Sequence, residues 1–274
     1  MELKELKRYY LRIDAIKEIE TYYKKEIGLV IAMVKFEELQ HLFNYAQHSF
    51  YLGMKEDHDV YSLDGNDELA QKGYRFFHLR HAIQDYNACY DYFLQIVYFG
   101  CDFFSEISSK KNYKENLKQC KWTNKKKDKD KAEFKDRIDE LIKNRNDDFK
   151  DFLSDFCSFY EYKNNNTYPL TNWTNQLKHR GGFTINELEE DQIKITILNK
   201  KTGKTVFSTD YIKPICVSFQ EIEKCLVNHN DKIVEYAEFL YKSLGLDDPV
   251  NFKKEFSANT QRIDTTDCEI KGKY

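Results

Sequence analysis

The segment 172–183 concentrates side chains that could carry out acid–base chemistry on a phosphate. Asn175, Lys178, His179 and Arg180 lie within six consecutive positions. On a helix, Asn175 would lie beside Lys178 and His179, because residues three and four apart are neighbours. Imidazole exchanges protons near neutral pH, and lysine and arginine bind phosphate groups. The spacing therefore predicts a site in which His179 is an acid or base and the two cations hold a phosphate.

Two glycines follow this cluster and predict where its helix ends. Gly181 and Gly182 can adopt the left-handed conformation that commonly terminates helices. A simpler interpretation is also open, because lysine and arginine at a helix C-terminus stabilise the helix dipole without any catalytic role. The cluster is therefore either a site or a solvated helix end.

A second set of polar residues lies on one stripe of a long aromatic helix, which we expect around residues 78–104. Their spacing of three and four residues places them on one face. They are Arg80, Gln84, Asn87, Asp91 and Gln95. The stripe is either an exposed edge or the lining of a cavity, and in a cavity its members need hydrogen-bond partners. In that case we expect Asp91 and Asn87 to contact the basic cluster at 178–180.

The composition favours a chain built mainly from helices. Of the 274 residues, 41% are apolar and 15% aromatic, which suffices for a core, whereas only 10 are glycine and 3 proline. The net charge of −3 excludes nucleic-acid binding over the whole surface, so any RNA contact requires a local basic patch. Seven cysteines without a Cys-x-x-Cys pair argue against a disulfide framework or zinc knuckle, and fit a reducing cytosol.

Neither a membrane segment nor a bound metal is expected. The chain begins Met-Glu-Leu-Lys-Glu, without the order of a signal peptide, and its longest uncharged apolar run, 27–34, is too short to cross a bilayer. These features predict a cytoplasmic protein with no membrane partner. His78 and His81 could face one ion, but no acidic partner stands at a familiar ligand spacing. We therefore expect no metal and no cofactor.

Apolar periodicity predicts four long helical regions besides the short helix of the basic cluster. Their apolar residues recur every three or four positions, which places them on one helix face. A capping box from Ser218 to Glu221 should open the last helix, and Gly245 should end it. The predicted regions are 14–53, 69–107, 132–162 and 218–245.

Two segments depart from this pattern. Ten lysines against three acidic residues in 108–131 predict a mobile solvated loop, with a nucleic-acid contact as the less common alternative. Alternating isoleucines at the start of 192–212 predict a β-hairpin. Together these features predict a mainly α domain over 1–245 with one small β-hairpin insertion, followed by a polar tail over 246–274.

This arrangement resembles the HEPN domain superfamily of prokaryotic host-defence and toxin proteins. The resemblance covers residues 14–245. It rests on the aromatic helix with its polar stripe and on the motif Asn175-x-x-Lys178-His179-Arg180-Gly181 before a β-hairpin and a last helix. It implies an up-and-down helical bundle that is usually dimeric. Active members are metal-independent ribonucleases whose composite site forms where two motif helices meet.

The resemblance implies that His179 is the catalytic histidine. The family's motif has an arginine separated from the histidine by four to six residues, and this chain has Asn-Trp-Thr at the corresponding positions, 172–174. The polar or basic residues that could take its place are Asn175, Lys178 and Arg180. Because inactive relatives serve as binding or antitoxin partners, the motif fits either an active or a silent member.

We therefore expect a metal-independent endoribonuclease of host-defence or toxin type, cleaving RNA as a homodimer. Tyr168, Trp173 and Phe183 beside the motif predict the core of the dimer interface. One alternative is a catalytically inactive module that binds a regulatory or antitoxin protein or a nucleotide. Another is a helical scaffold in which the basic cluster only closes a helix.

Overall fold

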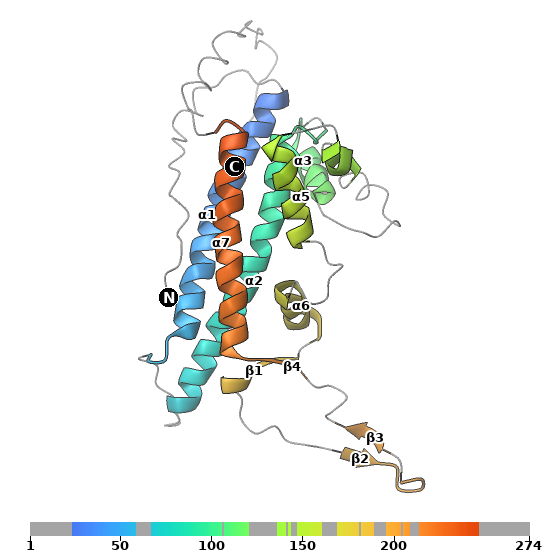
Figure 1. Ribbon diagram of the computed structural model, residues 1–274. Helices are drawn as coiled ribbons and strands as arrows, with labels where there is room; N and C mark the ends of the chain where they lie inside the picture. Colours follow the sequence, from blue (N-terminus) through green and yellow to red (C-terminus); the bar gives the residue numbers. More distant parts are fainter. Residues whose placement is uncertain are drawn as a thin grey trace, which may run out of the picture.

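Three long helices form the body of the protein, as Figure 1 shows. The computed structural model describes residues 24–58, 67–105, 107–120, 136–140, 142–143, 147–160, 169–180, 182–188, 196–203, 205–208 and 214–246. The long helices are α1 (Lys24–Met54), α2 (Asp67–Gly100) and α7 (Phe219–Ser243). α1 and α2 run in opposite directions along most of their length, and α7 packs against both. The predicted mainly α, up-and-down bundle is thereby confirmed.

Shorter elements surround this body. Helical residues at 136–140 and 142–143 precede α5, which packs on α7. The shorter elements are α3 (Lys110–Gln119), α5 (Asp148–Tyr160), α6 (Pro169–Asn175), η2 (Gln176–Arg180), β1 (Phe183–Ile185), η3 (Asn186–Leu188), β2 (Thr196–Leu198), β3 (Thr205–Ser208) and β4 (Ile215–Val217).

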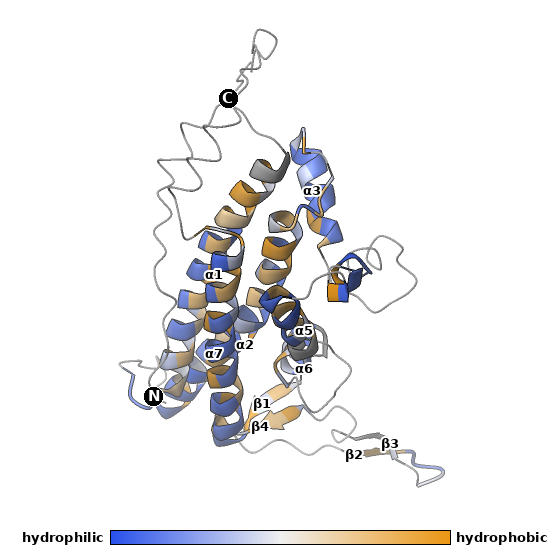
Figure 2. Cartoon of the chain, turned by 45° about the horizontal axis from the view of Figure 1, so that its top comes forward, coloured by the Kyte–Doolittle hydropathy of each residue, from blue (hydrophilic) through white to orange (hydrophobic). Residues whose placement is uncertain are grey.

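Aromatic side chains fill the space between the helices. Phe43 and Phe50 of α1 meet the fully buried Tyr86 of α2 edge to face, with ring centroids 5.9 and 6.4 Å apart. Phe156 of α5 packs in the same way on Tyr236 of α7, at 5.4 Å. Such pairs add to the stability gained by burying apolar area. The four helices therefore share one core, whose apolar residues appear orange in Figure 2.

A glycine permits the close approach of α1 to the end of α2. A Cβ atom on Gly28 would lie 2.4 Å from the carbonyl oxygen of Phe99 and 2.7 Å from the ring of Phe104. No larger residue fits there without moving backbone. α2 then ends at Gly100, earlier than the predicted 107, because Asp102 adopts a left-handed φ of 60°. The amide of Asp102 donates to the carbonyl of Phe99 in this turn.

Both predicted ends of α7 are confirmed. The Ser218 hydroxyl accepts from the amide of Glu221 at 3.2 Å, and the Glu221 carboxylate accepts from the Ser218 amide at 2.7 Å. The carboxylate of Glu187 also accepts from the amide of Phe219 at 3.0 Å, so it satisfies one more of the free amides of the first turn. Gly245 follows the helix with a φ of +68°.

The predicted hairpin is present as an antiparallel pair of β2 and β3, with Ile197 opposite Phe207. Its turn is fixed by the Asn199 side chain, which accepts from the amides of Lys201 and Thr202, and by Gly203 at a φ of +67°. Positions 192–195 and 209–212 of the predicted hairpin lie outside the described residues. A parallel pair of β1 and β4 was not predicted.

The lysine-rich segment is not simply the loop that its composition predicted. Residues 110–119 form α3, and the Ser109 hydroxyl caps it by accepting from the amide of Asn112. Asn116 is fully buried, and its side-chain oxygen accepts from the Tyr98 hydroxyl and the Ser105 amide. The rest of the segment, 121–131, lies outside the described residues, as do 14–23 and the tail beyond 246.

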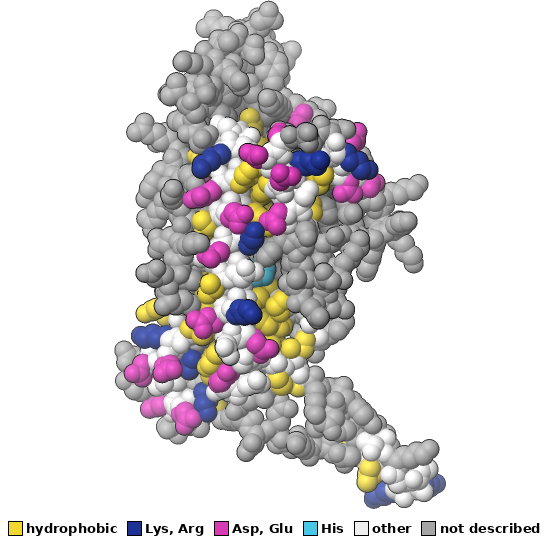
Figure 3. All heavy atoms as spheres, viewed as in Figure 1, with side chains coloured by type: hydrophobic (Ala, Val, Ile, Leu, Met, Phe, Trp, Pro, Cys, Tyr) yellow, Lys and Arg dark blue, Asp and Glu magenta, His cyan; other side chains and the backbone are white. Residues whose placement is uncertain are grey.

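The described surface carries charges of both signs. Figure 3 shows acidic and basic side chains intermixed along the face that contains α7, and basic side chains at the tip of the hairpin. Lys200 and Lys201 are exposed in that turn. In the part of the chain that the structure describes, every helix is too short or too polar to cross a membrane.

Candidate active site

The basic cluster lies in a helix, as predicted, but its last turn is of an unusual kind. α6 begins at Pro169, where a missing amide costs no helical hydrogen bond. From Gln176 to Arg180 the chain continues as the π-helix η2. π-helical turns are rare and occur frequently at functional sites. The predicted motif therefore lies on a π-helical turn and not on a regular α-helical one.

The second glycine after the motif has a role other than the predicted helix end. Gly182 does not take the left-handed conformation, and Gly181 lies outside the described residues. A Cβ atom at Gly182 would lie 2.9 Å from the Cα of Pro214. The Gly182 carbonyl also accepts from the amide of Ile215 at 2.7 Å. Gly182 thus lets the chain that leaves the motif run against the chain that enters β4.

Contacts on both sides hold the motif against α2. Before it, the Thr171 hydroxyl donates to the Asn87 side-chain oxygen at 3.1 Å, and the Thr174 hydroxyl to the carbonyl of Ile83 at 3.5 Å. After it, the ring of Phe183 lies 6.5 Å from that of Phe76. α6, η2 and β1 therefore run along α2 toward its N-terminal end.

These flanking contacts define which part of α2 lies level with the motif. Along the chain, η2 lies between the residues that make the contacts at Ile83 and at Phe76. Arg80 lies about 5 Å along the axis from the first and about 6 Å from the second, at 1.5 Å per residue. Its guanidinium is exposed and lies 5.8 Å from the centroid of the Phe76 ring. An exposed arginine therefore lies on the stretch of α2 between the two contacts that flank the Lys-His-Arg motif.

The structure brings together only part of the predicted site. Asn175 is half-buried and Lys178 is exposed. His179 and Arg180 belong to η2, but their side chains lie outside what the structure describes. Asn87 accepts from Thr171 of α6, and its expected contact with His179 stays a prediction because that side chain lies outside what the structure describes.

The polar stripe is mostly an exposed or half-exposed edge and not the lining of a cavity. Arg80 and Asp91 are exposed, and Gln84 and Gln95 are half-buried. Asp91 lies about 16 Å along α2 from Arg80, at 1.5 Å per residue, so the register favours Arg80 as the neighbour of the motif. Pairing of Asp91 with the motif stays a prediction.

The apolar residues expected in a dimer interface are part of the monomer's core. Trp173 and Phe183 are each 5% exposed, and their rings pack against each other at 6.1 Å. The predicted use of these two side chains as an interface core is therefore wrong, because they stabilise the contact of α6 and β1 with α2. Tyr168 lies outside the described residues. A homodimer stays a prediction without this support.

Sequence reasoning missed the residues that position the motif. Thr171 and Thr174 stand three apart on α6 and both bond to α2. Their spacing on a short helix with a buried tryptophan was the available signal. The contact of Phe76 with Phe183 joins residues far apart in sequence, and no local pattern announces it.

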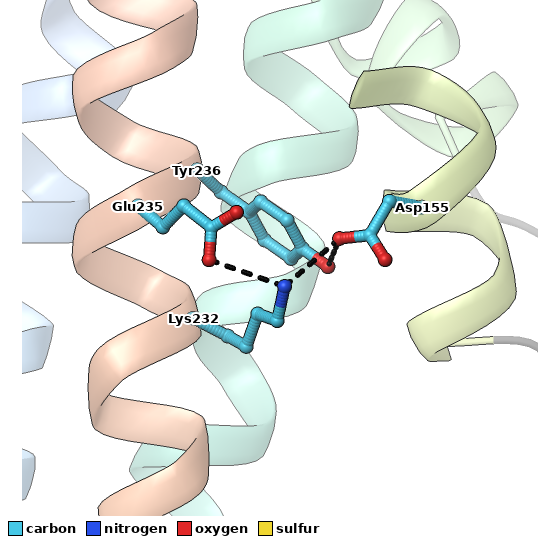
Figure 4. A network of polar contacts seen from close by, with 4 residues as sticks. All are labelled: Asp155, Lys232, Glu235 and Tyr236. Carbon is cyan, nitrogen blue, oxygen red and sulfur yellow. Dashed lines mark hydrogen bonds and ion pairs between the residues drawn. The ribbon is translucent and has the colours of Figure 1, made fainter. Parts of the chain in front are cut away.

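A second polar cluster joins α5 to α7 (Figure 4). The Tyr236 hydroxyl and the Lys232 ammonium both donate to Asp155, at 2.8 and 3.0 Å, and Lys232 also pairs with Glu235 at 3.1 Å. Burial alone would raise the pKa of Asp155, but the bonds from Tyr236 and Lys232 hold it below its ordinary value. A carboxylate kept ionised by two donors suits a structural clamp better than an acid–base catalyst.

A third polar group lies deeper between the long helices. The side-chain oxygen of Asn230 accepts from Gln47 of α1 at 2.7 Å and from the Tyr86 hydroxyl of α2 at 3.2 Å. Its neighbour His229 is almost fully buried, and burial lowers its pKa to about 4. These bonds join three helices, and the group is too deeply buried to meet a substrate from solvent.

Within the described ranges, no three histidine, cysteine or acidic side chains gather in a way that could hold a metal ion. Comparisons of this chain with family models, with curated proteins and with solved structures find no match.

Proposed function

We propose that this protein is a cytoplasmic, metal-independent endoribonuclease of host-defence or toxin type. The observation that carries the proposal is the Lys-His-Arg motif in a π-helix whose flanking residues contact α2 on either side of the exposed Arg80. Lys178 is exposed on that turn. A histidine among several cations is the set of groups that metal-free cleavage of RNA needs.

In the proposed reaction, the 2′-hydroxyl of a ribose attacks the adjacent phosphorus atom. A base takes the hydroxyl proton, the bond from phosphorus to the 5′ oxygen breaks, and an acid protonates that leaving oxygen. The products are a 2′,3′-cyclic phosphate and a 5′-hydroxyl. Acid–base catalysis contributes about 10²–10⁴-fold, and stabilisation of the phosphoryl charge adds to it.

Each residue of the motif has a role in this proposal. His179 acts as base or acid, Lys178 and Arg180 hold the phosphoryl oxygens, and Asn175 orients the substrate. One histidine cannot be both base and acid in the same step. Two copies of the motif across a homodimer axis would supply both groups.

The test is cleavage of a labelled single-stranded RNA pool in EDTA by the wild type and by His179→Ala. We expect cleavage with cyclic phosphate ends, which His179→Ala abolishes. The matched control is His41→Ala, which removes an exposed histidine of α1. Cleavage that persists in His179→Ala, or that EDTA stops, would refute the mechanism.

Light scattering at micromolar concentration tests the dimer, and a 33 kDa monomer that cleaves RNA would exclude the composite site.

A second function, a catalytically silent binding module for a regulatory or antitoxin protein, is favoured by one observation. Of the three positions where the resembling family has its arginine, Trp173 and Thr174 are buried and hold α6 in place. Only Asn172 is exposed. If the wild type is silent for lack of this arginine, Asn172→Arg should gain RNA cleavage, whereas Asn172→Gln should not.

A further inference from the structure

Five aromatic rings form a continuous ladder near the N-terminal end of α2. Centroid distances are 4.7 Å from His58 to Tyr74, 4.4 Å from Tyr74 to His78, 5.4 Å from His78 to Phe77 and 4.3 Å from Phe77 to His81. The Nε2 atom of His58 bonds to the carbonyl of Leu52 at 2.9 Å, which ties the first ring to the end of α1. We call this set the ring ladder.

The outer end of the ring ladder faces solvent. Phe77 is 55% exposed, and His81 is exposed as well. A large apolar ring on a helix surface contributes little to the fold of the monomer, since it is hardly removed from water. Its contact with His81 fixes its orientation before any ligand arrives, which lowers the entropic cost of binding. The two rings are thus an ordered and accessible aromatic surface.

This surface begins one helical turn from Arg80, which lies between the two contacts that flank the motif. Angles around the axis of α2 are measured from Ile83, which faces α6, at roughly 100° per residue. Arg80 then lies at about 60°, Phe77 at about 120° and His81 at about 160°. All three turn in the same direction, away from α6. A strand that leaves the motif across α2 therefore meets the guanidinium of Arg80 first and the rings of Phe77 and His81 next.

The chemistry of this path favours single-stranded RNA over other occupants. Unpaired bases stack on phenylalanine and histidine rings, and arginine contacts phosphate or stacks as well. A duplex hides its base faces, so it cannot use such rings. Burial, and then the charges of His48, His58 and His81, lower the pKa of His78. Burial thus disfavours a charge on the His78 ring, which suits it to supporting a stacked ring and not to holding a phosphate.

We propose that Phe77 and His81 form a stacking platform for unpaired bases beside the scissile phosphate, with Arg80 contacting the phosphate between motif and platform. This inference rests on the proposed function and names its substrate as single-stranded RNA. It also assigns a role to α2 that the motif residues do not have, which is to hold the strand on one side of the cleavage point.

The test is the affinity of full-length His179→Ala protein for a fluorescent 12-nucleotide single-stranded RNA in EDTA, measured by anisotropy. Adding Phe77→Leu keeps apolar volume but removes the ring face. We expect affinity to fall about ten-fold, the loss typical of one stacked base. Phe77→Tyr retains the ring and should bind like the parent. The matched control is Tyr45→Leu, which removes an exposed ring of α1.

The outcomes separate this inference from the proposed function. Equal affinity of the Phe77→Leu and Phe77→Tyr proteins, or a duplex bound as tightly as the single strand, would overturn the stacking platform. If the wild type cleaves RNA with a need for His179 while Phe77→Leu binds normally, the function stands and the platform falls. If binding needs Phe77 but no RNA is cleaved, the platform stands and catalysis falls. A change of oligomeric state in Phe77→Leu would show a protein interface there and overturn the proposal.

Discussion

Lowering the pH from 7 to 5 should destabilise this fold through His229. Its side chain is 3% exposed on α7, and burial lowers its pKa from 6.5 to about 4. Below pH 6.5 the unfolded chain takes up a proton at this residue, whereas the folded chain keeps the imidazole neutral until about pH 4. The unfolded state then binds more protons, so the free energy of unfolding falls as the pH falls between these values.

The size of the effect follows from the pKa difference. One pKa unit corresponds to about 1.4 kcal/mol. The lowering of the His229 pKa therefore corresponds in full to about 3 kcal/mol of the free energy of unfolding. About 2 kcal/mol of this is lost between pH 7 and pH 5. The remainder is lost only as the pH approaches the folded pKa, where carboxylates titrate too.

Urea unfolding at pH 7, 6 and 5 measures this loss. We compare the wild type with His229→Gln, which has a similar size but does not titrate in this range. The free energy of unfolding of the wild type relative to this variant should fall by about 2 kcal/mol from pH 7 to pH 5. His41→Gln, at an exposed histidine, should leave the wild-type pH dependence unchanged. A constant difference between wild type and His229→Gln would mean that the imidazole accepts its proton in the folded state, and the burial argument would be refuted.

Substitutions at three further positions test the helices and the helix cap by thermal and urea unfolding. Gly73→Ala should stabilise the protein by about 1 kcal/mol, because a Cβ there meets nothing within 4 Å on an exposed helix. Gly28→Ala should destabilise it by about 1–3 kcal/mol, since its Cβ would overlap the carbonyl of Phe99, and a neutral result would show that α1 and α2 are less closely packed. Ser218→Ala should cost about 1 kcal/mol through loss of the helix cap, whereas Ser218→Thr should cost much less.

Local patterns in the sequence predicted the elements that local chemistry determines. The capping box at Ser218 and the glycine at 245 specify α7 from both ends. The turn from Asn199 to Gly203 specifies its hairpin, because its hydrogen bonds are all within the turn. Helical periodicity likewise predicted most of α1 and α2, although not the point at which Asp102 ends the latter.

Elements that depend on distant partners could not be predicted in this way. β1 and β4 have three residues each, too few to show the alternation of apolar and polar residues that identifies a strand. Each of them forms only by pairing with the other. α3 was hidden by its lysines, since composition suggested a loop while Ser109 and the buried Asn116 define a helix. At the candidate site, the sequence located the motif and put Arg80 on the polar stripe of α2, but it could not show that the contacts flanking the motif fall on either side of Arg80.

The parallel pair of β1 and β4 also has a practical consequence. It holds the two ends of the segment between β1 and β4 side by side, with Phe183 opposite Ile215 and Ile185 opposite Val217. The turn from Asn199 to Gly203 lies at the far tip of that segment, away from the helical body (Figure 1). Exposed loop tips of this kind accept inserted domains well. A fluorescent protein or an affinity tag placed in the turn would leave both termini native, and would allow the protein to be followed or isolated with whatever it binds.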